Sequence, residues 1–211
     1  MRAKAEVSKC MVASGLRYGS ETWWPLVQEE KGLESVQLGA LKAILQVGMS
    51  TVSEFVRGEV GCFELKRERH RAMLIWAGRV VRCAEGRWVR KVYEMEWGKV
   101  GRCMKSWKAK VAELVKMYGL EEAFDEVGRG QGDWRKAVDA AVLERGVEEW
   151  KDGVREIGRV WAGDWGFEPY LEGGYGEGVR LMVKFRSGSA LLGEEMERGG
   201  WLGEGGVPSV Q

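Results

Sequence analysis

Proline is scarce in this chain, and its scarcity favours helices over a sheet built from many turn-bounded strands. Only three of the 211 residues are proline, whereas good helix formers such as alanine, leucine, glutamate and lysine are abundant. The 31 glycines act in the other direction, because each glycine inside a helix costs about 1 kcal/mol relative to alanine. We therefore predict a mainly α fold, an irregular multi-helix bundle in which glycine divides the helices into short pieces.

Apolar residues recur at spacings of three and four, the period of one buried helix face. The pattern predicts helices over 3–16, 33–47, 51–56, 64–84, 88–93 and 106–118. Thr51 and Glu54 have the spacing of a capping box, with a turn following at 58–61. Asp133 is expected to cap a helix that begins at Trp134. Glycine is dense from residue 173 onward, so we expect one more ordered element, at 179–185, and a poorly ordered tail over 191–211.

The reactive side chains give no support for an active site or a metal site. Cys10, Cys62, Cys83 and Cys103 lie far apart and form no C-x-x-C pair, so we interpret them as reduced, mostly buried thiols. His70 is the only histidine, which excludes multi-histidine metal sites and leaves a Ser-His-Asp triad without support. We expect His70 on a helix surface, between two arginines. No cofactor is implied.

Other motifs also point away from catalysis. The glycine-rich run 128–132 resembles part of a phosphate-binding loop, but it follows a helix and no Lys-Ser/Thr comes after it, so we interpret it as a linker. No closely spaced aspartate pair suggests a two-metal site. The chain also lacks a long apolar stretch and the apolar core of a secretory signal. We therefore expect an intracellular protein, nuclear or cytoplasmic, with no enzyme activity and no membrane partner.

Charge is distributed unevenly along the chain. Residues 64–110 contain 14 Lys and Arg against 5 Asp and Glu, whereas residues 111–178 contain 8 against 16. The basic stretch could contact a phosphate backbone, or the two stretches could neutralise one another across a helix interface. Trp76, Trp88, Trp97 and Trp107 lie among the basic residues, where a tryptophan can stack on a base but more often belongs to a core. The charge distribution leaves these alternatives open.

Three blocks of the sequence carry recognisable motifs. The run from Leu16 to Trp23 reads Leu-Arg-Tyr-Gly-Ser-Glu-Thr-Trp, which resembles the Tyr-Gly-Ser/Ala-Glu-Thr-Trp motif in the reverse transcriptases of non-LTR retrotransposons. Residues 41–47 are similar to the segment that follows it there. Residues 56–82 resemble the Gly-Glu-Leu-Gly segment and its arginine-rich helix, although Cys62 and Glu64 depart from the family pattern. Weaker likenesses at 88–93 and 185–189 extend the resemblance over most of the chain.

The resemblance implies a thumb-like region at 1–118 and a connection-like region at 119–190. The family's catalytic palm would precede residue 1 and its zinc knuckle would follow the chain, so it implies a part that holds an RNA-DNA or RNA template-primer without catalytic residues of its own. The residues expected to contact phosphates are Arg67, Arg71, Arg79, Arg82, Arg90 and Lys91. Tyr18, Trp23 and Trp76 are expected to pack. The alternatives are a helical protein-interaction module, whose acidic half covers its basic half, and a translated transposon remnant without a selected function.

Overall fold

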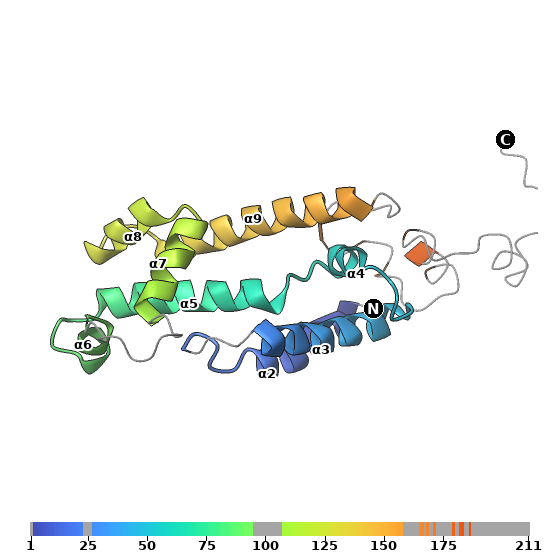
Figure 1. Cartoon of the computed structure of the whole chain (residues 1–211), viewed down its shortest axis with the longest axis horizontal. Helices are drawn as coiled ribbons and strands as arrows, with labels where there is room; N and C mark the ends of the chain where they lie inside the picture. Colours follow the sequence, from blue (N-terminus) through green and yellow to red (C-terminus); the bar gives the residue numbers. More distant parts are fainter. Residues whose placement is uncertain are drawn as a thin grey trace, which may run out of the picture. The chain divides into compact units, whose positions relative to one another are not determined.

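The computed structural model describes residues 2–22, 27–94 and 107–157, together with residues 165, 166, 168, 171, 179, 182, 183 and 186. Over these residues the fold is helical and contains no strand (Figure 1), so the predicted mainly α class is confirmed. The helices are α1 (Arg2–Ser8), α2 (Ser14–Leu16), α3 (Val27–Leu45), α4 (Ser53–Val60), α5 (Leu65–Arg82), α6 (Trp88–Glu94), α7 (Trp107–Met117), α8 (Glu121–Gly128) and α9 (Trp134–Ile157), with a π-helical segment, Lys9–Ala13, between α1 and α2. None of the described helices is long and apolar enough to cross a bilayer.

The helix predicted over 3–16 is present, but it contains the π-helical segment. The ranges 64–84, 88–93 and 106–118 correspond to α5, α6 and α7. The helix predicted over 33–47 begins earlier, at Val27. Glu29 and Glu30 lie in its first turn, where negative side chains interact favourably with the helix dipole.

The predicted start of α4 is wrong. Val52 occupies the N-cap position and no side chain caps the helix, so Thr51 and Glu54 do not form a capping box. The turn expected at 58–61 is also misplaced. The helix continues through Gly58 and ends where Gly61 adopts a left-handed backbone with φ of 61°, a conformation that glycine reaches without steric cost.

The chain folds into two compact units. The first unit contains residues 1–14, 35–62 and 150–211, and the second contains residues 15–34 and 63–149. The boundary expected between residues 118 and 119 lies inside the second unit, where Tyr118 and Leu120 belong to the same core. The two units are therefore each built from segments distant in sequence.

The core of the second unit surrounds α5. Met73, Leu74 and Ala77 of α5 are fully buried, and helices α7 and α8 pack against α5 (Figure 1). The other buried members come from α7, α8, the start of α9 and the residues between them: Val111, Leu114, Val115, Tyr118, Leu120, Val127, Trp134, Val138 and Val142. Apolar side chains of α5 therefore lie at the centre of this core.

The core of the first unit joins α3 and α4 to residues from the C-terminal part of the chain. Its buried members are Leu41, Leu45, Phe55, Val56, Val60, Cys62, Leu171 and Val183. Arg186 adds an ion pair, because its guanidinium contacts the buried Glu59 and also Glu168, each at 2.9 Å. Val179, Met182 and Val183 are helical, but most of the predicted element at 179–185 and the tail at 191–211 lie outside the described residues.

Glycine does not divide the helices as expected. Two glycines inside helices are covered by tryptophan rings of α9. A Cβ atom on Gly78 would lie 2.1 Å from Trp134, and one on Gly58 would lie 2.5 Å from Trp150. The absence of a side chain at these positions lets each ring lie directly on a helix backbone, so the packing offsets the lower helix propensity of glycine.

Two smaller predictions concern α9 and the cysteines. Asp133 caps α9, since its Oδ1 accepts the backbone N–H of Lys136 at 3.2 Å, and the run 128–132 leads from α8 into α9 as the predicted linker.

Of the cysteines, Cys62 is buried, as expected. Cys10 is exposed, because it lies in the N-terminal helical segment outside the core, and Cys103 lies outside the described residues.

We predict that Gly78→Ala lowers the free energy of unfolding by roughly 2 kcal/mol, because the new methyl group must displace the Trp134 ring. Gly39 of α3 provides a matched control, since a Cβ atom added there would meet no other atom within 4 Å; Gly39→Ala should instead stabilise by up to about 1 kcal/mol. Urea denaturation of both variants gives the comparison. A Gly78→Ala protein as stable as the wild type would contradict the packing described above.

Candidate nucleic-acid interface

The first two predicted phosphate contacts, Arg67 and Arg71, lie in ion pairs of the second unit. Arg67 is 7% exposed and donates a hydrogen bond to Glu149 of α9 at 2.5 Å. Arg71 is half-buried and donates its Nε–H to Asp139 of α9 at 2.7 Å. Burial encloses the Arg67 guanidinium, and the carboxylate that accepts from Arg71 offsets its positive charge. This placement does not support Arg67 and Arg71 as phosphate contacts, and it shows that carboxylates of α9 neutralise these two arginines locally.

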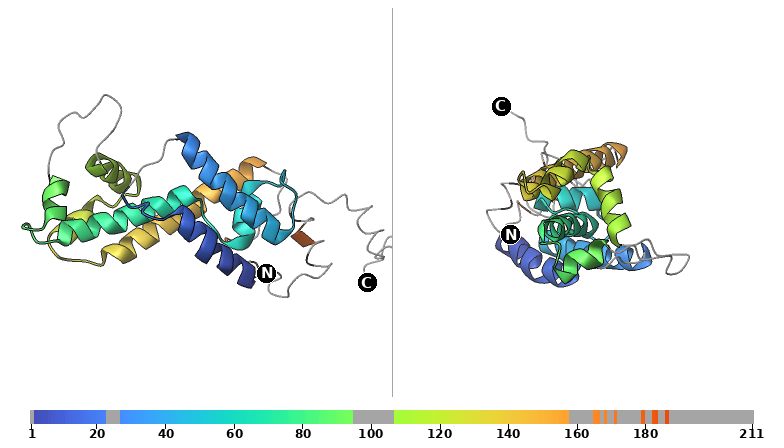
Figure 2. Two further views of the ribbon diagram at one scale, coloured as in Figure 1. Left: turned by 90° about the horizontal axis from the view of Figure 1, so that it is seen from below. Right: turned by 90° about the vertical axis from the view of Figure 1, so that its left-hand side faces the viewer.

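Arg90 attaches α6 to the end of α5. Its guanidinium donates to the backbone carbonyl of Val81 and forms an ion pair with Glu94 in the next turn of α6. Figures 1 and 2 show α6 beside the C-terminal end of α5. Arg90 therefore has a positioning role in the fold, with its Nε–H and an Nη1–H already donated.

The remaining predicted contacts, Arg79, Arg82 and Lys91, are exposed. Arg82 donates to the carbonyl of Gly132 at 3.2 Å, and within the described part of the chain none of the three forms an ion pair. Arg79 and Arg82 are three residues apart on α5, a spacing that places two side chains one above the other. These positions are the part of the predicted site that stays accessible to a polyanion.

Sequence reasoning missed Arg87, which is exposed and directly precedes α6. A run of basic residues around Trp88 is the signal that could have identified it. We call Arg79, Arg82, Arg87 and Lys91 the basic end of the second unit. From residue 79 to residue 91 the only acidic residue is Glu85, so this part of the chain keeps a positive charge.

Helix α6 has two unlike faces. On one, Tyr93 packs edge to face on Trp107, with ring centroids 5.9 Å apart. On the other, the Trp88 side chain is 75% exposed, and the Lys91 Nζ lies 5.3 Å from the centre of its ring. Trp107 thus packs, as a tryptophan at helical spacing usually does, whereas Trp88 does not.

Tyr18 of the family motif is expected to pack, but the structure places its side chain in solvent. It is 88% exposed, so that prediction is wrong. Its neighbour Arg17 reaches Glu68 of α5 instead, at 2.7 Å, and this orientation turns Tyr18 outward. Trp76 is half-buried, and Trp23 and Trp97 lie outside the described residues.

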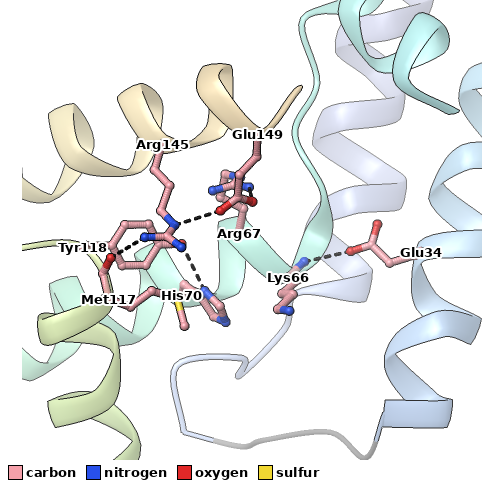
Figure 3. A network of polar contacts seen from close by, with 8 residues as sticks. All are labelled: Glu34, Lys66, Arg67, His70, Met117, Tyr118, Arg145 and Glu149. Carbon is pink, nitrogen blue, oxygen red and sulfur yellow. Dashed lines mark hydrogen bonds and ion pairs between the residues drawn. The ribbon is translucent and has the colours of Figure 1, made fainter. Parts of the chain in front are cut away.

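His70 is buried, which corrects the prediction of a surface position. Its side chain is 3% exposed and its Nδ1 lies 3.0 Å from the Tyr118 hydroxyl (Figure 3). The spacing of His70 to Met73, Leu74 and Ala77 is the one that shares a helix face, so the apolar row could have revealed the burial. The two flanking arginines were the misleading signal.

Burial and, after it, the positive charges of Arg69, Lys66 and Arg67 together lower the pKa of His70 from 6.5 to about 3. The imidazole is therefore neutral near pH 7. Burial raises the pKa of Glu149, but the hydrogen bonds and charges of Arg67 and Arg145 outweigh that effect and leave this pKa below its usual value. The imidazole of His70 is thus neutral and enclosed, and the Glu149 carboxylate is held by two arginines.

Comparison with known proteins identifies no relative. No family model, curated protein or solved structure matches this chain. Among the described residues, no group of three or more histidine, cysteine, aspartate or glutamate side chains is arranged to hold a metal ion. A function is therefore inferred from the basic end and from the sequence motifs.

We predict that His70 makes the protein less stable as the pH falls from 7.5 to 5. Unfolding returns the imidazole to its ordinary pKa of 6.5, so between pH 6.5 and pH 3 the unfolded chain binds a proton that the folded chain does not. The loss attributable to this group is about 2 kcal/mol at pH 5. His70→Leu should remove that component from urea denaturation curves recorded at the two pH values.

The matched control is Tyr118→Phe, which removes the hydroxyl near His70 but keeps the titrating imidazole. This variant should retain the pH dependence of the wild type, although its stability at pH 7.5 changes. If His70→Leu loses as much stability on acidification as the wild type does, the acid sensitivity comes from other groups and the argument about His70 fails.

Proposed function

We propose that this chain binds nucleic acid through the phosphate backbone and that it corresponds to the thumb and connection region of a non-LTR retrotransposon reverse transcriptase. It would then be a part of an RNA-directed DNA polymerase without catalytic residues of its own, acting inside the cell on an RNA-DNA or RNA template-primer. The observation that carries the proposal is the basic end, where arginines and a lysine are exposed and are not in ion pairs with described residues.

Charge supports a backbone contact at this position. Phosphate binding by arginine and lysine gives affinity without sequence preference, because binding releases counterions from the nucleic acid. Arginine suits the task, since its planar guanidinium donates two parallel hydrogen bonds to one phosphate. Arg79 and Arg82 are one helical turn apart on α5, so both can meet the same strand.

The sequence resemblance supports the same function. The blocks at 16–22 and 56–82 fall on α2 with its following turn and on α4 and α5. Basic residues of the third block, Arg79 and Arg82, belong both to the resemblance and to the basic end. The resemblance and the exposed charge therefore share these two arginines at the end of α5.

A helical protein-interaction module is the second candidate, and the ion pairs favour it. Arg67 and Arg71 are neutralised by Glu149 and Asp139, as expected if the acidic stretch covers the basic one. For such a module salt weakens folding, because it screens the pairs, and no nucleic acid binds. Denaturation curves at low and high salt, recorded beside the binding assay below, distinguish the two candidates.

We predict that the protein binds a labelled RNA-DNA hybrid at about 50 mM salt, where phosphate contacts are least screened, and that the affinity falls steeply as salt rises. The double variant Arg79→Ala/Arg82→Ala should bind more weakly and show a shallower salt dependence, by about 0.9 in logarithmic slope for each phosphate that is no longer bound. Fluorescence anisotropy titrations over a salt series measure both quantities.

The control is Arg135→Ala/Arg155→Ala. It removes the same charge from two exposed arginines of α9, which pair with Asp139 and Asp152, and it should leave the affinity almost unchanged. Absence of binding at low salt would overturn the proposed function. An equal loss in both double variants would show that net charge alone, and not the basic end, determines the affinity.

A further inference from the structure

Trp88 is a large apolar side chain left in solvent within a basic surface. It is 75% exposed, it follows the exposed Arg87, and Lys91 lies next to its ring at 5.3 Å. Single tryptophans are rarely displayed to this extent, because burial of an aromatic ring is strongly favourable. The position therefore suggests a ligand that covers the ring.

The register of α6 keeps Trp88 outside. Trp88, Lys91 and Val92 are spaced by three and four residues and share one helix face, and Val92 is also exposed. Arg90 and Tyr93 occupy the other face, where they contact α5 and Trp107. Rotating α6 to bury Trp88 would break these contacts.

We propose that Trp88 stacks on an unpaired nucleobase, so that the basic end prefers single-stranded segments or unpaired ends to continuous duplex. This inference rests on the proposed function and names its substrate class. The ligand must offer a flat apolar face together with negative charge, because Lys91 lies over the ring and the exposed Arg87 directly precedes Trp88 in the chain. A single-stranded nucleic acid has both, whereas in a duplex the base faces are already stacked on one another.

The position of Lys91 fits a stacked nucleotide. Its ammonium group lies over one face of the ring, as a cation does on an aromatic face. A base would stack on the opposite face, with its phosphate attracted to this charge. Arg87 lies on the other side of Trp88 in the sequence and supplies a second cation. Stacking and phosphate contacts are the combination by which proteins hold single strands without reading their sequence.

The test compares two single-stranded oligodeoxynucleotides of equal length, one with normal bases and one with a central run of abasic sites. Both carry the same number of phosphates, so the difference in affinity reports the bases alone. We expect the wild type to bind the oligonucleotide with bases about tenfold more tightly. Trp88→Leu should bind both with the same affinity, equal to that of the wild type for the abasic strand.

Tyr18→Leu is the matched control, because Tyr18 is an exposed aromatic side chain of the same unit outside the basic end. It should keep the tenfold preference. Since Trp88 is exposed, its replacement should leave the circular dichroism spectrum and thermal unfolding unchanged, which separates weaker stacking on the ligand from a folding defect.

The outcomes separate this inference from the proposed function. If the wild type binds both oligonucleotides equally, or if Trp88→Leu keeps the preference, stacking by Trp88 is overturned while backbone binding stands. If neither oligonucleotide nor the RNA-DNA hybrid binds at about 50 mM salt, both proposals fail.

Discussion

The packing of a tryptophan ring on a helical glycine is the interaction around which each unit is built. In the second unit the Trp134 indole lies on Gly78 and donates its Nε1–H to the Leu74 carbonyl at 2.7 Å. In the first unit Trp150 lies on Gly58 and donates to the Glu54 carbonyl, also at 2.7 Å. In both cases the acceptor stands four residues before the glycine, so the ring gains close packing while its polar atom stays satisfied.

This packing decides which arginines of α5 are covered. Counting back from Gly78, Leu74, Arg71 and Arg67 are spaced by four, three and four residues and therefore lie on the face that meets α9. Arg67 and Arg71 then find Glu149 and Asp139. Arg82 continues the same row, but it extends past the first residue of α9 and meets a backbone carbonyl of the preceding loop instead of a carboxylate.

Periodicity was sufficient to predict most helices, because apolar spacing depends on nearby residues only. It failed where a distant partner decides the outcome. From the sequence alone Gly78 is expected to weaken its helix. The Trp134 ring that covers it comes from a distant part of the chain, so a local pattern cannot reveal the contact. The same applies to the site: the carboxylates that neutralise Arg67 and Arg71 lie 82 and 68 residues away, so a charge count could not distinguish paired from accessible arginines. His70 was misjudged from its charged neighbours, although its own apolar row pointed inward.

The excess of positive charge between residues 64 and 110 is therefore not uniformly available. Along the first turns of α5, Arg67, Arg69 and Arg71 are each held by a carboxylate of the second unit. Burial, together with the charges of Arg69, Lys66 and Arg67, lowers the pKa of His70 and keeps it neutral. Near the end of α5 the exposed arginines are in no ion pair with described residues. The exposed side chain of Trp88 lies in α6, the next helix. Because a folding role explains the first group and does not explain the second, a ligand that is both anionic and flat is the occupant that accounts for the charge and the ring together.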